Sequence, residues 1–445
     1  MVDVFRVRGF TFIARWSKMT AANERSATQA RASMERGEFS ASDLLAACLD
    51  RIDARDGEVK AWRHLNDEGA VATAKALDQR SDESLVQNEP LYGLPLGIKD
   101  IIDTADMSTT YGSAAYPNNQ TTHDAACVSL ARAAGGIPLG KTVTTEFAYF
   151  EPGNTTNPHN PNHTPGGSSS GSAAAVADFM VPLAFGTQTA GSVIRPASYC
   201  GVVGYKATYG ALPMYGVKAL AHDLDTLGWF CREVADIDLM RAALIGTPIG
   251  IEARQPRIGL CRTHEWEQAD PDSQAAVLNA AQSLEAAGAK VCDLNLPTVF
   301  ADLVSWQKIV IAQNAARDLS FEYNQLPDRL SYHVVDLIEQ GLSVEFKNYQ
   351  AALAAATNGR FALGKIFQGV DVLLCPSAPG EAPEGLESTG DPIHNRMWTL
   401  LGNPCINLPG HLGTHGLPVG VQAVGAMGRD ENLISFCKWM ERKIV

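Results

Sequence analysis

The sequence has no run of apolar residues long enough to cross a membrane, and it has no pair of cysteines in C-x-x-C spacing. Its nine cysteines are an odd number, which does not suit a complete disulfide framework. These absences argue against a membrane protein, a cysteine zinc site and a disulfide-stabilised secreted domain. We therefore expect no membrane partner, cysteines that act as small buried apolar residues, and a cytoplasmic protein.

Basic residues are also scarce for a chain of this size. The 445 residues include 36 Lys and Arg against 49 Asp and Glu, which gives a formal net charge of −13. Since proteins bind phosphate backbones through clustered Lys and Arg, this balance argues against nucleic acid as a partner. With 45% hydrophobic residues, the chain is long enough to bury a large core without disulfides or metals.

The first 18 residues differ from the rest of the chain. They are basic and partly apolar, but the apolar stretch is too short for a signal peptide, and no cleavage site of small residues follows. We expect residues 1–18 to be a dispensable extension, with Met19 as an alternative start. Residues 19–445 are expected to form a single domain. A Pro-rich stretch at its start marks 247–380 as a candidate helical subdomain.

Helix-like and strand-like patterns alternate along the chain. Apolar residues at helical spacing predict helices over 40–51, 68–79, 124–134, 273–288, 307–318, 349–364 and 431–442. Apolar or β-branched runs predict strands over 142–147, 201–205, 370–375 and 417–424, and a short buried strand before Lys99. This alternation predicts an α/β fold in which helices cover both faces of a sheet.

Residues 135–142, GGIPLGKT, match the phosphate-loop pattern G-x-x-x-x-G-K-[ST]. A phosphate loop follows a strand and opens a helix, so that the helix N-terminus faces the phosphates. Here a helical segment precedes the pattern, the β-branched TVTTEF follows it, and Pro138 removes a backbone N–H. We favour a helix end at Gly135-Gly136 leading into a strand, and keep a nucleotide-binding protein as a lesser alternative.

Residues 164–176, TPGGSSSGSAAAV, contain G-x-S-x-G with Ser169 at its centre, the nucleophile elbow of α/β-hydrolases. That elbow needs a hydrophobic strand before it, whereas the Asn- and Pro-rich stretch NPHNPNHTPGG precedes it here. His394, His411 and His415 are candidate partners for such a serine, but none has a distinctive context. We therefore expect Ser169 and Ser170 to hold the turn and cap the following helix.

Seven motifs follow one another along the chain: GLPLGIKD (93–100), GKTVTTEFAY (140–149), NPHNP (157–161), TPGGSSSGSAAAVA (164–177), GTQTAGSVIRPASYCGVVGYK (186–206), HDLDTLGWF (222–230) and GLPVGVQAVG (416–425). On these motifs the sequence resembles the amidase signature family, amide-bond hydrolases with a Ser–cis-Ser–Lys triad. The resemblance extends from about residue 40 to the C-terminus. It implies the amidase-signature fold, a large mixed β-sheet covered by α-helices on both faces.

The resemblance also implies roles for individual residues. Ser192 is the implied nucleophile, Ser168 the bridging serine after a cis peptide bond with Gly167, and Lys99 the general base. The implied oxyanion hole consists of backbone N–H groups of the nucleophile loop: Thr189, Ala190, Gly191 and Ser192.

The residue types suit these roles. Small residues around Ser192 let backbone amides converge on one point, where they can meet the charge of an oxyanion. A serine attacks only when a base takes its proton, and a lysine can be that base only if burial keeps it neutral. Lys99 follows an apolar run and is expected to be buried; the alternative is an ion pair with Asp100.

The nucleophile loop departs from the usual family pattern D-T-G-G-S-I-R. Gln188 replaces the Asp, Ala190 replaces a Gly, and the arginine has moved on by one position to Arg195. In a malonamidase-like subgroup an arginine at this shifted position binds a substrate carboxylate, which Arg195 could also grip in a bidentate manner. A structural brace is the equal alternative. Gln188, Gly167 and Tyr149 are the other expected substrate-binding residues.

The resemblance implies a serine amidohydrolase that cleaves the C–N bond of a small amide or aryl amide through an acyl-enzyme on Ser192. A urethanase-like or biuret-like hydrolase of carbamate or urea-type bonds is an open alternative. The A subunit of the tRNA-dependent glutamine amidotransferase is a lesser one. We expect no cofactor and no metal, since Pro161 lies between His159 and His163 and prevents a helical zinc pair. A homodimer is a further expectation.

Overall fold

The computed structural model describes residues 6–7, 10–11, 21–80 and 88–444. Of the expected extension, the two short antiparallel strands β1 (Arg6–Val7) and β2 (Phe10–Thr11) are described. The rest of residues 1–18 lies outside the described residues, so its dispensability stays a prediction. No helix in the described part of the chain is long and apolar enough to span a membrane.

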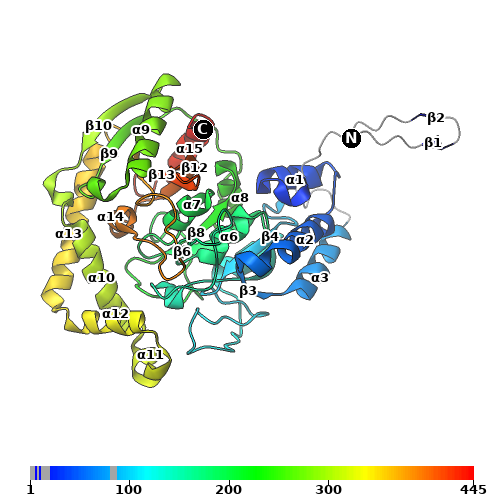
Figure 1. Cartoon of the computed structure of the whole chain (residues 1–445), viewed down its shortest axis with the longest axis horizontal. Coiled ribbons are helices and arrows are strands. Elements are labelled where there is room, and N and C mark those ends of the chain that lie inside the picture. Colours follow the sequence, from blue (N-terminus) through cyan, green and yellow to red (C-terminus); the bar gives the residue numbers. More distant parts are fainter. Residues whose placement is uncertain (1–5, 8–9, 12–20, 81–87, 445) are drawn as a thin grey trace.

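The centre of the molecule is one mixed sheet of eleven strands (Figure 1). Its strands, from one edge to the other, are β10 (Lys290–Asn295), β9 (Arg257–Arg262), β11 (Val372–Pro376), β13 (Pro418–Val424), β12 (Cys405–Leu412), β7 (Val203–Lys206), β8 (Thr226–Cys231), β6 (Leu183–Gln188), β4 (Pro95–Lys99), β5 (Ile137–Thr142) and β3 (Trp62–Leu65). The central strands are buried along their length, as expected for strands covered on both faces.

Helices cover both faces of this sheet, which confirms the predicted fold class. The helices are α1 (Ala27–Glu35), α2 (Ala41–Val59), α3 (Asp67–Asp78), α5 (Ala126–Ala133), α6 (Ser170–Ala177), α7 (Ile194–Cys200), α8 (Ile237–Ile245), α9 (Pro271–Ala286), α10 (Leu303–Asp318), α11 (Ser320–Gln325), α12 (Tyr332–Ser343), α13 (Phe346–Ile366), α14 (Ile393–Leu401) and α15 (Asp430–Glu441). All seven helices predicted from the sequence are present.

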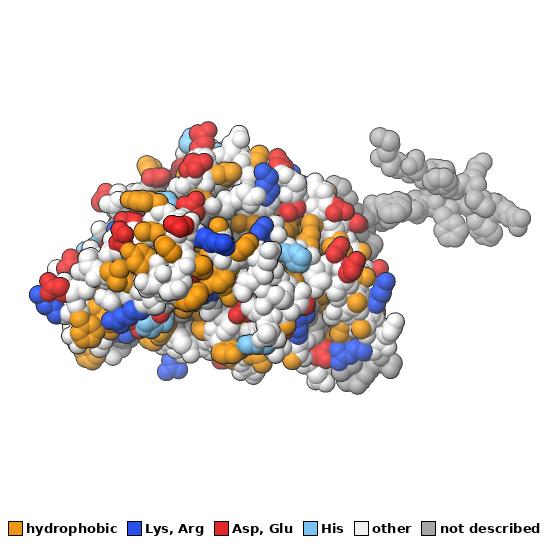
Figure 2. All heavy atoms as spheres, turned by 90° about the horizontal axis from the view of Figure 1, so that it is seen from below, with side chains coloured by type: hydrophobic (Ala, Val, Ile, Leu, Met, Phe, Trp, Pro, Cys, Tyr) orange, Lys and Arg blue, Asp and Glu red, His pale blue; other side chains and the backbone are white. Residues whose placement is uncertain are grey.

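The segment 247–380 combines helices with strands of the common sheet. It contributes β9, β10 and β11 to that sheet, and α12 and α13 both pack against α10 (Figure 1). On the face of the molecule in Figure 2, Lys and Arg side chains are interspersed with Asp and Glu side chains.

The strand predicted over 142–147 is wrong by several residues, because the strand runs from Ile137 to Thr142. This position also contradicts the phosphate-loop alternative, since the GKT sequence lies inside β5 and no helix follows it directly. The amine of Lys141 is buried and donates to the Ile102 carbonyl at 2.6 Å and to Thr109 Oγ1 at 2.6 Å. It is therefore bound inside the protein rather than presented to a phosphate.

The sheet places two chain segments beside each other. Strands β4 and β6 are parallel neighbours, with Leu96 opposite Leu183 and Gly97 opposite Ala184. Parallel strands end at the same edge of a sheet, which is where α/β proteins build their sites. Lys99 at the end of β4 therefore lies next to the loop that follows Gln188 at the end of β6.

Helix α6 begins in close contact with the strand region of the sheet. Gly171 N donates to the Val143 carbonyl at 3.0 Å, and Val143 N donates to the Ala61 carbonyl at 2.9 Å. A Cβ on Gly171 would lie 2.1 Å from the Ala61 carbonyl oxygen and 2.4 Å from Val143 N. Both are backbone atoms, so no side chain can swing aside to make room.

We predict that Gly171→Ala lowers the free energy of unfolding by about 1–3 kcal/mol, because the added methyl group displaces backbone. Gly57→Ala is the matched control: it lies exposed in α2, where an added Cβ meets nothing within 4 Å. Alanine there should stabilise the helix by about 0.5–1 kcal/mol. Thermal unfolding of both variants checks this, and equal melting temperatures would contradict the packing described for Gly171.

Candidate active site

Lys99 is a buried amine with no carboxylate partner among the described residues. Its Nζ lies 2.7 Å from Ser168 Oγ and 2.9 Å from Thr187 Oγ1, and its side chain is fully buried. Burial lowers the pKa of Lys99 well below its ordinary value of 10.5, and the more distant charge of Asp225 opposes this only in part. This lowering of the pKa shifts the amine toward its neutral form, the form that can accept a proton.

The alternative ion pair between Lys99 and Asp100 is not formed. Asp100 instead accepts from Thr110 N at 3.2 Å and from Thr110 Oγ1 at 2.5 Å, and its Oδ1 lies 3.4 Å from Lys141 Nζ. The two adjacent residues of the Lys-Asp pair therefore serve different purposes: Asp100 neutralises Lys141, and Lys99 faces Ser168.

The three consecutive serines also differ in what they contact. The peptide bond between Gly167 and Ser168 is cis, as the resemblance implies, and Ser168 Oγ contacts Lys99. Ser169 directly precedes the first residue of α6, but its side chain makes no capping bond, so the expectation that Ser169 caps this helix is wrong. Its Oγ instead accepts from Thr187 N at 3.4 Å. Ser170 Oγ donates to the Gly166 carbonyl at 2.8 Å and so holds the turn.

Ser192 lies in the short loop between β6 and α7, and this loop is held from behind. Gln307 Nε2 donates to the Thr189 carbonyl at 3.0 Å, and Thr399 Oγ1 donates to the Ala190 carbonyl at 2.7 Å. Because a trans peptide is planar, the next N–H in each case points the opposite way. The N–H groups of Ala190, Gly191 and Ser192 have no hydrogen-bond partner among the described residues.

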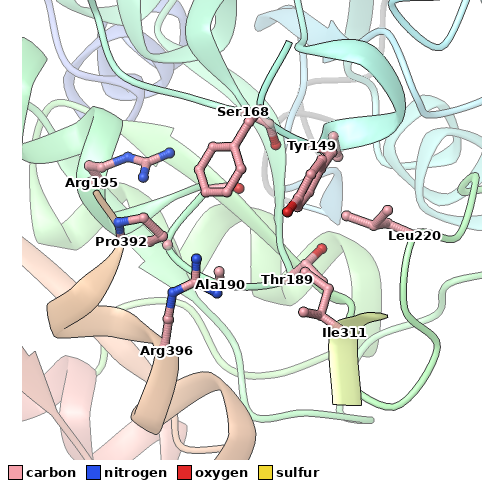
Figure 3. A pocket seen from close by; sticks show the side chains of 13 residues that line it. Tyr149, Ser168, Thr189, Ala190, Arg195, Leu220, Ile311, Pro392 and Arg396 are labelled. Atoms are coloured by element: carbon pink, nitrogen blue, oxygen red, sulfur yellow. The ribbon is translucent and has the colours of Figure 1, made fainter. Parts of the chain in front are cut away.

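A pocket of about 320 Å³ opens in front of this loop (Figure 3). It is lined by Ala148, Tyr149, Phe150, Ser168, Thr189, Ala190, Gly191, Ser192, Arg195, Leu220, Ile311, Pro392 and Arg396. The structure therefore brings Ser168, Ser192 and the expected oxyanion-hole residues to one cavity. Tyr149 and Arg195 lie there too.

Gln188 and Gly167 are not among the residues that line the pocket. Gln188 Oε1 accepts from Val193 N at 2.9 Å and from Ile194 N at 3.1 Å, and Gln188 Nε2 donates to Thr399 Oγ1 at 3.0 Å. The side chain of Gln188 is thus a brace for the nucleophile loop and not a substrate contact. In the usual family pattern, the residue at the position of Gln188 is an aspartate.

Arg195 is tied to the protein by both of its terminal nitrogens. Nη1 donates to the Gly390 carbonyl at 2.6 Å, and Nη2 donates to the Gly167 carbonyl at 2.7 Å and to Thr389 Oγ1 at 3.1 Å. Burial lowers the pKa of Arg195 to about 10, so the guanidinium stays charged at neutral pH. These bonds match the brace alternative, although one edge of the side chain still borders the pocket.

Sequence reasoning missed several residues around the loop. Asp225 accepts from Thr189 Oγ1 at 2.5 Å and from the amides of Leu220 and Ala221, and burial raises its pKa to about 6. Asp225 lies in the HDLDTLGWF motif, and this motif was the feature of the sequence that could have identified it. Gln307, Arg396 and Thr399 lie on α10 and α14 and carry no local pattern that marks them.

The histidines proposed as partners of Ser169 do not contact it. His394 has both ring nitrogens buried without a partner among the described residues, and His415 Nδ1 is bonded to Glu381 at 2.7 Å. The Nε2 of His411 is likewise buried without a partner in the described part of the chain. The α/β-hydrolase alternative is therefore wrong. The rings of His159 and His163 contact the carbonyls of Cys200 and Ala382.

Comparison with known proteins agrees with this geometry. A family model described as Amidase matches residues 43–434. The chain belongs to the amidase family. It is 31% identical to the A subunit of the glutamyl-tRNA(Gln) amidotransferase of Lachnospira eligens, over 92% of this chain and 96% of that protein. As a member of this family, the protein is a C–N hydrolase of mixed α/β fold.

Solved structures show the same fold over nearly the whole chain. A crystal structure of an amidase matches with a TM-score of 0.85 at 29% identity, over 94% of this chain and 99% of that one. The peptide amidase from Stenotrophomonas maltophilia matches with a TM-score of 0.77 at 26% identity, over 95% of this chain and 97% of that one.

We predict that Thr399→Val weakens both stability and amide hydrolysis, because it leaves the buried Ala190 carbonyl without its donor. An unsatisfied buried group costs about 1–3 kcal/mol of unfolding free energy. Thr357→Val is the matched control, because this exposed hydroxyl on α13 binds the Leu353 carbonyl in its own helix. A melting temperature of Thr399→Val equal to that of the control would contradict the bracing role.

Proposed function

We propose that this protein is a stand-alone serine amidohydrolase that cleaves a C–N bond through an acyl-enzyme on Ser192. The observation that carries the proposal is the buried Lys99 amine, 2.7 Å from the Oγ of Ser168, because Ser168 and Ser192 both line the cavity. A neutral amine in contact with one of two hydroxyls at the cavity would supply a base, a proton path and a nucleophile.

Each proton has a place to go in this arrangement. Ser192 Oγ attacks the substrate carbonyl carbon and gives its proton to Ser168, while Ser168 gives its own proton to the neutral amine of Lys99. The tetrahedral anion collapses as the C–N bond breaks, and the same path returns a proton to the leaving amine. Water then attacks the acyl-enzyme by the reverse route and releases the acid and free Ser192.

The anion formed in this step needs fixed donors. The N–H groups of Ala190, Gly191 and Ser192 are unpartnered among the described residues and border the cavity, which supports their role as the oxyanion hole. Removing one such donor typically lowers turnover on the order of 10²–10³-fold. The bonds from Gln307 and Thr399 fix the loop before substrate binds, so little reorganisation is needed.

The A subunit of an amidotransferase is the second candidate, because the curated relatives of about one-third identity carry that name. That function needs partner subunits and tRNA. The net charge of −13 and the departures at Gln188 and Ala190 favour the stand-alone hydrolase instead. Hydrolysis by the purified chain without any partner would support the first candidate, and hydrolysis only with added subunits would support the second.

The substrate class remains to be chosen among primary amides, aryl amides and carbamates, since all three use the same acyl chemistry. The apolar part of the lining, with Phe150, Leu220 and Ile311, suits a compact organic group. A hydrolysis panel with one member of each class decides among them, with Ser192→Ala as the blank.

We predict a strict order of effect among serine variants on whichever substrate of the panel is cleaved. Ser192→Ala should reduce hydrolysis to background. Ser168→Ala should lower kcat by about 10²–10⁴-fold, the usual contribution of general acid–base catalysis. Ser169→Ala is the matched control, because its hydroxyl does not line the cavity, and it should have the smallest effect of the three. The assignment fails if Ser169→Ala is the most damaging variant.

A further inference from the structure

The cavity holds two positive charges and no negative one. Arg195 and Arg396 are its two charged lining residues; they are 2% and 6% exposed, and no carboxylate belongs to the lining. Neither guanidinium forms an ion pair within the described part of the chain. The charge of Asp391 acts on both guanidinium groups, but Asp391 is exposed and makes no ion pair with either. Buried charges are normally paired, so the charge of this cavity suits an anionic ligand.

The two arginines differ in which nitrogens the protein already uses. Both terminal nitrogens of Arg195 donate to protein acceptors, which leaves Nε alone without a partner. Arg396 uses Nη1 for Gln307 Oε1 at 2.7 Å, and no acceptor among the described residues bonds to its Nε or Nη2. The Nε atoms of both arginines are buried, so the Nη2 of Arg396 is the terminal nitrogen left to donate a charge-assisted hydrogen bond to an anion in the cavity. Arg195 has no such terminal nitrogen, because both of its own are bonded to the protein.

Figure 3 places both arginines on one side of the cavity, across from Leu220 and Ile311. The bond to Gln307 fixes the direction of the Arg396 guanidinium, and Gln307 in turn holds the Thr189 carbonyl at 3.0 Å. An anion on Arg396 would thus be joined to the nucleophile loop through one intervening side chain.

We infer that Arg396 is a specificity-determining residue that binds a carboxylate of the substrate, so that the preferred substrates are monoamides of short dicarboxylic acids. This inference rests on the proposed function of the cavity, because it assigns the rest of the substrate to Ser192. For Arg195 it takes the brace, one of the two equal alternatives that the sequence left open, because this residue holds the Gly167 and Gly390 carbonyls.

A binding measurement on a variant that lacks Ser192 tests this inference independently of catalysis. The full chain with Ser192→Ala is titrated by calorimetry with succinamate and with butanamide, its neutral counterpart of the same length. We expect succinamate to bind more tightly than butanamide, and Arg396→Gln to weaken succinamate binding about 10- to 100-fold, the range of hydrogen bonds to a charged group. Arg396→Lys keeps the charge but replaces the guanidinium held by Gln307 with a flexible ammonium, and it should give an intermediate affinity.

Arg195→Gln is the matched control, and it should weaken both ligands by a similar factor, because it loosens the Gly167 and Gly390 carbonyls. The inference is overturned if the chain with Arg396 intact binds succinamate no better than butanamide, a comparison that needs no variant at 396 to fold. It is also overturned if Arg195→Gln, rather than Arg396→Gln, selectively weakens the binding of succinamate, or if Arg396→Gln weakens the binding of both ligands equally. Selective binding without hydrolysis of any amide by the chain with Ser192 would instead refute the proposed function alone.

Discussion

The buried contact between the Lys99 amine and the Ser168 hydroxyl is the constraint on which the rest of the site depends. No carboxylate among the described residues lies within bonding distance of this amine, so burial lowers its pKa and favours the neutral form. The proposed function rests on that preference, because only a neutral amine can accept a proton.

The sheet creates that environment by bringing two chain segments together. Strand β4 carries Lys99 to its end, and the parallel neighbour β6 ends where the nucleophile loop begins. The loop is then fixed by side chains from helices far along the chain, with Thr399 and Gln307 holding its carbonyls outward. Because these carbonyls are bonded away from the cavity, the N–H groups that follow them stay without a partner among the described residues. The candidate active site therefore depends on packing between α10, α14 and the sheet edge.

Sequence-based prediction identified residues that lie in local motifs. It did not identify residues whose position in the candidate site depends on packing between distant segments. The helices followed from periodicity, and the contact between Lys99 and Ser168 was implied by the resemblance of the ordered motifs to the amidase signature family. The strand at 137–142 was misplaced because Pro138 and Gly140 interrupt its apolar pattern, while β-branched residues follow in the loop after it. No feature of the sequence gave a reason to select Arg396, because only the folded structure shows that its guanidinium has donors without acceptors among the described residues.

The pH dependence of Ser192 labelling by a fluorophosphonate tests the central claim most directly, because it reports the proton path without a known substrate. With the pKa of Lys99 well below 10.5, the rate should be level at alkaline pH and fall about tenfold per pH unit only below that lowered pKa, where the amine is protonated. Asp225→Asn serves as the control, because Asp225 has a pKa of about 6 and the acidic limb must persist without it. A rate that keeps rising up to pH 10.5 would show an ordinary lysine and contradict the account.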